Sequence, residues 1–336
     1  MCCLTAREAA LIVEIRRQTR YIRTREGPVK RKIIVDTDPG IDDALALALL
    51  VKSPEVTVHA VTAASGNLPA EECLKNIHRI YGFLRIEEKP LIGMGPDWPR
   101  SGEDARHIHG KDGLANTYLP VFLRNAAQPA AKLIASILTG SAEPVTILAL
   151  APLTNIADAL DRIDFHTAKV ERIVLMGGAF HVPGNASPLG EFNIHHDPEA
   201  ARRVINSPLP VTIVPLDITT RLVFTVRDFD AFAKCRRGAG RLARNLLPFY
   251  LQAHRRYHRL DGVHLHDVIA AAVVAAGDLF KTRRVWCDVE TEGEITRGTT
   301  VADDRPFTPR EPNVEVVSSF DEKALKNFIL SRLATD

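Results

Sequence analysis

The 336-residue chain lacks an apolar run long enough to cross a membrane. Its longest uninterrupted apolar runs, 268–276 and 44–51, have nine and eight residues, whereas a spanning helix needs about 20. The beginning of the chain also lacks an apolar core followed by small residues at a cleavage site, which is the pattern of a secretory signal. We therefore expect neither a membrane span nor secretion.

Cysteines are few and show no pattern. The five cysteines, at positions 2, 3, 73, 235 and 287, form no Cys-x-x-Cys pair and no Cys/His spacing typical of a zinc site. Reduced thiols in the cytoplasm are the expected state of such residues. The cysteines therefore predict neither a disulfide framework nor a thiolate metal centre.

The net charge of the chain is small as well. Lys and Arg number 43 and Asp and Glu number 41, which leaves a net charge of +2. Residues 1–31 hold eight basic and three acidic residues, so residues 32–336 hold 35 basic and 38 acidic ones. A body with a net charge of −3 is not a basic nucleic-acid binder.

The basic segment 1–31 differs from the rest of the chain. Its apolar residues recur at multiples of helical spacing, and Arg residues lie between them. Thr5 and Glu8 form a possible capping box, and Gly27-Pro28 ends the helix. We predict that 1–31 is a basic helical extension, solvated or packed on its own subunit, and that 32–336 is the folded body.

From Lys32 onward, short β-rich runs alternate with helical runs. Expected strands are 32–37, 56–63, 90–93, 145–149, 172–176 and 211–215. Expected helices are 42–52, 70–84, 130–138, 153–160 and 198–205. This alternation predicts an α/β fold with a mostly parallel, Rossmann-like open sheet flanked by helices. The C-terminal part is mainly helical, with helices at 241–259, 267–276 and 321–333 and short strands at 285–290 and 314–317.

An acidic cluster follows the first expected strand, and ligands of open parallel sheets bind beyond the carboxyl ends of the strands. Its carboxylates, Asp36, Asp38, Asp42 and Asp43, repel one another unless a positive charge lies among them. A hard cation with oxygen ligands, Ca²⁺ or Mg²⁺, supplies that charge. The intervening Pro-Gly pair allows a tight turn that brings Asp38 and Asp43 onto one ion.

The same acidic residues also fit a helix cap or a phosphatase site. The acids can cap a helix N-terminus and face solvent, although a position directly after a buried-type strand favours a metal site. Phosphatases of the haloacid-dehalogenase type also place Asp-x-Asp after their first strand, on Mg²⁺. Here Pro-Gly-Ile-Asp-Asp follows the second acid, whereas that family has a Gly-Thr type of turn at this point.

The segment Asp-Thr-Asp-Pro-Gly-Ile-Asp-Asp-Ala resembles the signature of the inosine–uridine-preferring nucleoside hydrolase family. Seven further segments match that family in order: Gly66-Asn67, His109-Gly110-Lys111-Asp112-Gly113-Leu114, Leu-Ala-Pro-Leu-Thr-Asn-Ile-Ala at 150–157, Met176-Gly177-Gly178, Asn185, Glu191-Phe192-Asn193 and His266-Asp267. Each segment alone is a weak signal, but their shared order is a strong one. The resemblance implies a nucleoside hydrolase-like catalytic domain at 32–336 that hydrolyses the N-glycosidic bond of ribonucleosides.

The resemblance also implies a calcium site. One Ca²⁺ would be held by the carboxylates of Asp38, Asp43 and Asp267 and by the backbone carbonyl of Leu150, with water and two ribose hydroxyls completing the coordination. Asp38 is implied as the general base on a metal-bound water. The transition state would have the oxocarbenium character of glycoside hydrolysis.

Substrate contacts follow from the same resemblance. It implies Asp42, Asn67, Glu191 and Asn193 as ribose-binding positions, with Asn185 as another near the 5′-hydroxyl. Met176 either packs on the ribose or belongs to the core. His266 is implied to polarise or protonate the leaving base, with His109 as a second base-side histidine, and an ordinary histidine pKa near neutrality suits that task. We choose His266 over His264 because it directly precedes Asp267. The Tyr- and His-rich helix expected at 241–259 would line the base pocket or form a lid.

The leading hypothesis is therefore a Ca²⁺-dependent ribonucleoside hydrolase. The alternatives are a nucleoside- or ribose-binding module without turnover, a hydrolase of a non-standard riboside and, more distantly, a metal-dependent phosphatase. The family commonly forms homodimers or homotetramers, so we also expect self-association. The sequence pattern leaves the nucleobase preference open.

Overall fold

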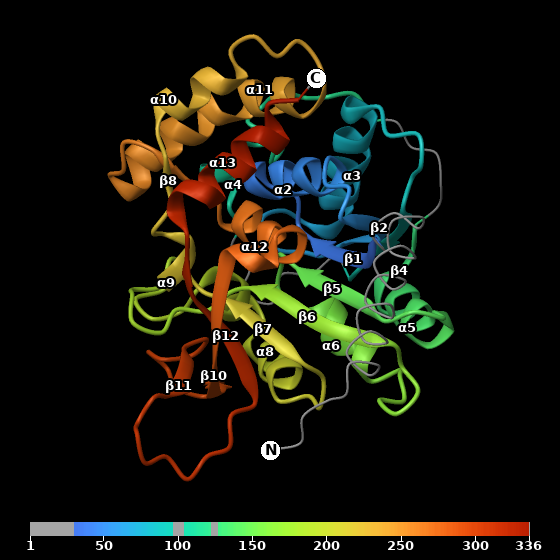
Figure 1. The fold of residues 1–336 in the computed structure, drawn as a ribbon, viewed down its shortest axis with the longest axis vertical. Coiled ribbons are helices and arrows are strands. Elements are labelled where there is room, and N and C mark those ends of the chain that lie inside the picture. Colours follow the sequence, from blue (N-terminus) through green and yellow to red (C-terminus); the bar gives the residue numbers. More distant parts are fainter. Residues whose placement is uncertain (1–29, 97–103, 122–126, 336) are drawn as a thin grey trace, which may run out of the picture.

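The computed structural model describes residues 30–96, 104–121 and 127–335. Within these ranges a ten-stranded sheet has the order β11-β10-β12-β7-β6-β5-β1-β2-β3-β4 (Figure 1). Its strands are β1 (Arg31–Thr37), β2 (Val56–Ala63), β3 (Leu91–Met94), β4 (Gln128–Pro129), β5 (Val145–Ala149), β6 (Val170–Met176), β7 (Val211–Val214), β10 (Phe280–Val289), β11 (Thr300–Asp303) and β12 (Val314–Phe320). Strands β1 to β7 pair in parallel and β12 joins β7 in parallel, whereas β10 runs antiparallel to β11 and β12.

Helices cover both faces of this sheet (Figure 1). One face carries α2 (Ile41–Val51), α3 (Ala70–Leu84), α11 (Gly238–Ala253), α12 (His266–Ala275) and α13 (Glu322–Leu333). The opposite face carries α5 (Ala130–Gly140), α6 (Thr154–Leu160) and α8 (Pro198–Ile205). Short elements complete the described chain: α4 (Arg106–His109), α7 (Phe192–His196), α9 (Leu216–Thr219), α10 (Val226–Phe229), 3₁₀ turns at Asp230–Phe232 and Gly277–Leu279, a π-helical turn at His254–His258 and the ribbon of β8 (Val223–Phe224) and β9 (Val263–His264).

The central strands are apolar on both faces because both faces are covered. In β1, Ile33 and Val35 pack into the core under α2 and α12, whereas Ile34 packs into the core under α5 and α6. Helix α2 is buried along Ile41–Leu50, since α11, α12 and α13 pack against it in addition to the sheet. An interior helix with two acids in its first turn therefore begins at the carboxyl end of a buried strand.

The predicted fold class is confirmed, and strand 56–63 and helices 70–84 and 198–205 have the predicted bounds. The C-terminal part contains more strand than its pattern predicts. Strand β10 starts at Phe280, and β11 is not predicted at all. Of the expected extension, 1–29 lies outside the described residues, while Arg31 already belongs to β1. No helix of the described ranges combines the length and apolar character that a membrane span requires.

Candidate active site

Four residues that the sequence predicts for the site lie at or beyond the carboxyl ends of neighbouring strands, and a fifth, Asn193 in α7, contacts two of them. Asp38 follows β1 and Asn67 follows β2, and the backbone N–H of Asn67 donates to Asp38 Oδ2 at 2.6 Å. Leu150 follows β5 and Met176 ends β6, and the side-chain amide of Asn193 donates to both carbonyl oxygens, at 3.2 and 3.0 Å. The parallel sheet therefore brings together residues from five separate segments of the chain.

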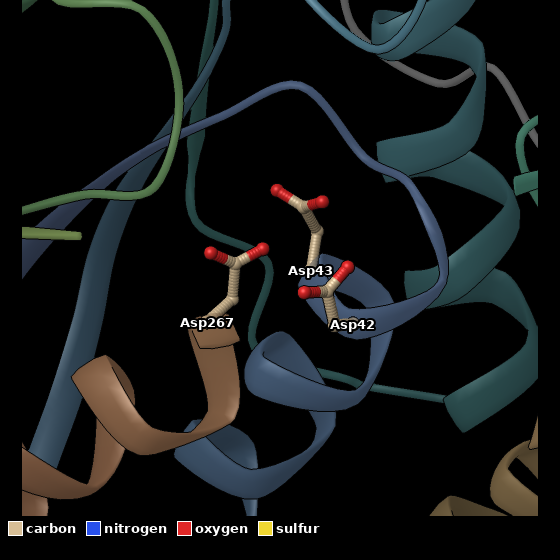
Figure 2. A group of neighbouring side chains, drawn as sticks. All are labelled: Asp42, Asp43 and Asp267. Carbon is tan, nitrogen blue, oxygen red and sulfur yellow. The ribbon is translucent and has the colours of Figure 1, made fainter. Parts of the chain in front are cut away.

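Three buried carboxylates meet where α2 and α12 begin. Asp42 and Asp43 lie in the first turn of α2, and Asp267 lies in the first turn of α12. Figure 2 shows these side chains gathered between the two helix N-termini. Their carboxylate oxygens lie within 4.8 Å of one another, a separation at which one metal ion can contact all three groups.

Asp43 is the third residue of α2, and hydrogen bonds from three neighbouring residues hold its carboxylate in place. Its Oδ2 accepts the backbone N–H of Gly40 at 2.9 Å, so the Asp43 side chain caps the N-cap amide at the start of the helix. The Thr37 hydroxyl donates to Oδ1 at 2.5 Å, and the Asn67 amide donates to Oδ2 at 3.3 Å. The carboxylate is thus oriented before any ligand arrives.

The electrostatics of the cluster favour a positive charge among the carboxylates. Burial raises the pKa of Asp38 and Asp267 well above the ordinary value, and repulsion from Asp43 raises both further. Burial followed by repulsion from Asp43 raises the pKa of Asp42 to about 7. Asp38 Oδ1 is buried and has no hydrogen-bond partner among the described residues. Hard oxygen donors in this state fit a divalent cation such as Ca²⁺ or Mg²⁺.

Asp38 lies beside this cluster without being one of its three members. The compact group contains Asp42, whereas the family resemblance implies Asp38 as the third metal carboxylate. Asp38 is nevertheless close enough for its charge to raise the pKa of Asp267. The missing side chain of Gly66 leaves room for Asp38, because a Cβ atom at Gly66 would lie 2.1 Å from Asp38 Oδ2.

The two predicted base-side histidines lie close to the carboxylate cluster, His109 beside Asp42 and His266 directly before Asp267. His109, the last residue of α4, has its Nδ1 4.0 Å from Asp42 Oδ1 and 3.0 Å from the backbone nitrogen of Ile41. His266, the first residue of α12, has its Nδ1 2.7 Å from the hydroxyl of Thr219. Burial lowers the pKa of His109 to about 3 and that of His266 well below its ordinary value. The expectation of a pKa near neutrality is therefore wrong, because burial disfavours the charged ring.

The remaining predicted ribose positions divide into two groups. Glu191 is buried, and its Oε2 accepts the backbone N–H groups of Gly178 and Ile194, which caps α7. Asn193 follows in the same helix and reaches the strand ends described above. Asn185 is exposed, and its Oδ1 accepts the backbone N–H of Phe192 at 2.8 Å. That hydrogen bond is typical of a loop residue, and it does not bring Asn185 to the carboxylates.

Known proteins share this arrangement over nearly the whole chain. The model of the inosine-uridine preferring nucleoside hydrolase family matches residues 33–327. The pyrimidine-specific ribonucleoside hydrolase RihA of Klebsiella pneumoniae is 37% identical over 310 residues, which are 90% of this chain and 98% of that protein. RihA of Escherichia coli is 37% identical over 308 residues, which are 90% and 97% of the two chains.

The chain belongs to the inosine-uridine preferring nucleoside hydrolase family. Solved structures agree with this assignment. A plant nucleoside hydrolase matches with a TM-score of 0.85 at 29% identity, over 92% of this chain and 100% of that one. A purine-preferring ribonucleoside hydrolase from Gardnerella vaginalis matches with a TM-score of 0.83 at 28% identity, over 90% and 98% of the chains. Membership makes the protein an N-ribosyl hydrolase.

Asp36, which the sequence groups with the acidic cluster without an individual role, lies in the structure of this nucleoside hydrolase as a buried link between segments. Asp36 is fully buried beneath the site and accepts hydrogen bonds from Thr62 in β2 at 2.5 Å and from Asn155 in α6 at 2.9 Å. Burial raises its pKa to about 7. Asp36 therefore ties together the segments that carry Asp38 and Leu150, and its position in the strand before Asp38 was the only signal in the sequence.

Aromatic and histidine side chains form one wall of the hydrolase site. The Tyr250 hydroxyl hydrogen-bonds Asp42, and its ring stacks on His109 with centroids 5.5 Å apart. His254 packs edge-on against Tyr250 at 4.4 Å and lies 5.9 Å from the ring of His264. The expected helix at 241–259 thus lies against the carboxylates through Tyr250. Its last turn is π-helical, a local irregularity common at functional sites.

Proposed function

We propose that the protein is a Ca²⁺-dependent ribonucleoside hydrolase that releases ribose and free base and prefers pyrimidine nucleosides. The observation that carries the proposal is the buried carboxylate cluster at the carboxyl ends of the strands, where Asp38 Oδ1 has no partner among the described residues. The pyrimidine preference rests on RihA, named as pyrimidine-specific and 37% identical, against 28% for the purine-preferring enzyme of Gardnerella vaginalis.

The proposed calcium ligands are the carboxylates of Asp38, Asp43 and Asp267 and the carbonyl of Leu150. All are hard oxygen donors, and the carboxylates are buried in mutual repulsion that a divalent cation relieves. When bound, Ca²⁺ supplies the positive charge that offsets these carboxylates and makes neighbouring water and hydroxyl groups more acidic. Asp42 belongs to the same compact cluster, but we assign it to the ribose because the Tyr250 hydroxyl already holds it.

Asp38 is the proposed general base. Its carboxylate would accept a proton from the attacking water while the water oxygen bonds to C1′ of ribose and the N-glycosidic bond breaks. Asp42, Asn67, Glu191 and Asn193 would bind the ribose hydroxyls, with Asn185 near the 5′-hydroxyl and Met176 packing on the sugar. The carboxylates would also stabilise the positive charge that develops on the ribosyl ring.

His266 and His109 are proposed to act on the leaving base. Since burial keeps both rings neutral, they would donate hydrogen bonds to the departing base instead of acting as imidazolium acids. We also propose a cytoplasmic homodimer or homotetramer. The buried thiols of Cys73 and Cys287 form no disulfide with another described residue, which supports a reducing compartment.

The test is release of free base from uridine, cytidine, inosine, adenosine, guanosine and nicotinamide riboside, each with and without a chelator. We expect release that a chelator abolishes, that Ca²⁺ restores, and that is fastest for uridine and cytidine. Faster release from purine nucleosides would contradict the pyrimidine preference alone, and release only from nicotinamide riboside would point to a non-standard substrate. Stoichiometric binding without release of any base would instead favour a binding module, and unchanged release in chelator would overturn the calcium site.

A further inference from the structure

Thr219 is a buried threonine whose hydroxyl contacts a proposed catalytic histidine. It ends α9, has no exposed surface, and places its Oγ1 2.7 Å from Nδ1 of His266. The two residues are 47 positions apart in the sequence, so only the fold brings them together. Nδ1 is the ring nitrogen that cannot face the substrate while this contact is made.

The direction of this hydrogen bond follows from where the hydroxyl hydrogen can go. A threonine in a helix often donates to the carbonyl four residues earlier, and Thr220 does so, to Leu216 at 2.6 Å. For Thr219 that carbonyl belongs to Pro215 and already accepts the backbone N–H groups of Ile218 and Thr219. Among the described residues His266 is the one partner of the Thr219 hydroxyl. Because buried hydroxyls rarely leave their hydrogen unpaired, Thr219 donates to Nδ1.

A donor at Nδ1 fixes the tautomer of the neutral ring. When Nδ1 accepts a hydrogen bond, the ring hydrogen lies on Nε2. The same state holds for His109, whose Nδ1 lies 3.0 Å from the backbone nitrogen of Ile41. A backbone N–H can only donate, so the hydrogen of neutral His109 also lies on Nε2. The Thr219 hydroxyl and the Ile41 amide thus hold His266 and His109, respectively, in the same tautomer, with the ring hydrogen on Nε2.

We propose that Thr219 is a positioning residue that keeps His266 in the Nε2–H tautomer, so that the ring donates a hydrogen bond to the departing base. The inference rests on the role proposed above for His266. A lone pair at Nε2, the alternative tautomer, would repel the electrons that collect on the base as the N-glycosidic bond breaks. Within the described part of the chain, the Thr219 hydroxyl bonds neither a ribose-binding residue nor the carboxylate cluster, so its effect passes through His266.

The kinetic test compares Thr219→Val with Thr219→Ser and with the neighbouring control Thr220→Val, which also loses a threonine hydroxyl. Thr219→Val has nearly the shape of threonine without the donor. On uridine we expect kcat to fall about 10- to 100-fold, within the range of general acid–base contributions, with KM changed less than about threefold. On p-nitrophenyl riboside, whose leaving group needs little help, we expect a loss below about threefold. Thr219→Ser and Thr220→Val should both stay within about threefold of the original enzyme on both substrates.

Equal losses on both substrates, full activity of Thr219→Val on uridine, or failure of Thr219→Ser to recover activity would each overturn the proposal. A direct readout is the ¹⁵N NMR spectrum of the full chain labelled at histidine, with His266 assigned by its absence in His266→Gln. We expect a pyridine-type Nδ1 and a pyrrole-type Nε2 signal, and a shift toward the other tautomer in Thr219→Val. A pyrrole-type Nδ1 in the original protein would refute the inference. This spectrum is decisive even if no nucleoside is hydrolysed, so failure of the proposed function and failure of this inference are distinguishable.

Discussion

At the scale of single residues, the site is built from buried carboxylates, and their burial is energetically unfavourable unless a cation lies among them. Asp38 is the clearest case, because it is fully buried, one oxygen accepts the Asn67 N–H and the other has no partner among the described residues. An unpaired buried charge destabilises a fold, and this cost supports the proposal that Asp38 serves the chemistry of the site and not its stability.

We predict that Asp38→Asn lowers kcat on uridine by at least about 10³-fold, because an amide cannot accept the proton of the attacking water. In chelator, the melting temperature should be unchanged or higher, since one of several repelling carboxylates is removed. Stopped assays at saturating Ca²⁺ and thermal melts in chelator measure the two effects. A rate near that of the original enzyme would exclude Asp38 as the base.

The role proposed for His266 at the leaving base can be tested by comparison with its neighbour His264. We predict that His266→Ala slows uridine hydrolysis by about 10²-fold or more but slows p-nitrophenyl riboside less than about fivefold, because only the natural base needs a hydrogen-bond donor. His264→Ala is the matched control, since its ring lies 5.5 Å from that of His266 and belongs to the same aromatic wall. If His264→Ala shows the larger, substrate-selective loss, the assignment belongs to His264.

At the scale of elements, the site is built by close approach of strand ends and the loops after them. The loop after β2 passes so near Asp38 that a Cβ at Gly66 would lie 2.1 Å from Oδ2 of that carboxylate and 2.9 Å from Pro152. We predict that Gly66→Ala displaces Asp38, weakens Ca²⁺ binding at least about tenfold and costs about 1–3 kcal/mol of stability as an overpacked site does.

Gly140→Ala is the control for that substitution. A Cβ at Gly140 meets nothing within 4 Å, and Gly140 ends α5, where alanine is the better helix former. Its Ca²⁺ affinity should equal that of the original protein. Calcium titration by calorimetry and thermal melts compare the two variants. Equal calcium affinity of Gly66→Ala and Gly140→Ala would show that the loop after β2 can shift to accommodate the added Cβ atom without displacing Asp38.

The order of elements was largely predictable from the sequence, because apolar runs and helical periodicity alternate clearly up to β7. Strand β11 was not predictable, since Thr300–Asp303 is a short edge strand whose pairing with β10 is a long-range contact. In the site, the strand-end rule located the carboxylates, and the resemblance supplied Asp267 and the histidines. Contacts such as Thr219 with His266 were beyond prediction, because side chains 47 residues apart leave no local pattern.

At the scale of the whole molecule, buried acids make the metal-free fold sensitive to pH. Burial is the main cause that raises the pKa of Asp36, Asp42 and Glu191 to about 7, from ordinary values of 3.8, 3.8 and 4.5. When the pH lies between the unfolded-state and the folded-state pKa of such a carboxyl, the folded protein binds more protons than the unfolded chain does. The stability that these acids contribute to the metal-free protein is therefore highest at the acidic end of this window and falls as pH rises through it. Buried His109 and His266, whose pKa is lowered, contribute in the opposite direction below about pH 6.5, the pKa of an unfolded histidine, so the acids dominate the slope just above pH 7.

We predict that in chelator the melting temperature falls by a few degrees between pH 7 and pH 8.5, where these acids lose their protons and an unfolded histidine is already neutral, and that Ca²⁺ raises it more at pH 8.5 than at pH 7. The ion binds the deprotonated carboxylates, so binding releases protons, and saturation at about 100 times the Kd adds about 2.7 kcal/mol to the free energy of unfolding. Melts at both pH values, with chelator or with Ca²⁺, measure the difference. Asp267→Asn, which lacks one of the repelling carboxylates, should lose less stability across the window in chelator. A melting temperature that rises with pH in chelator, or an equal effect of Ca²⁺ at both values, would contradict a cation site built from these acids.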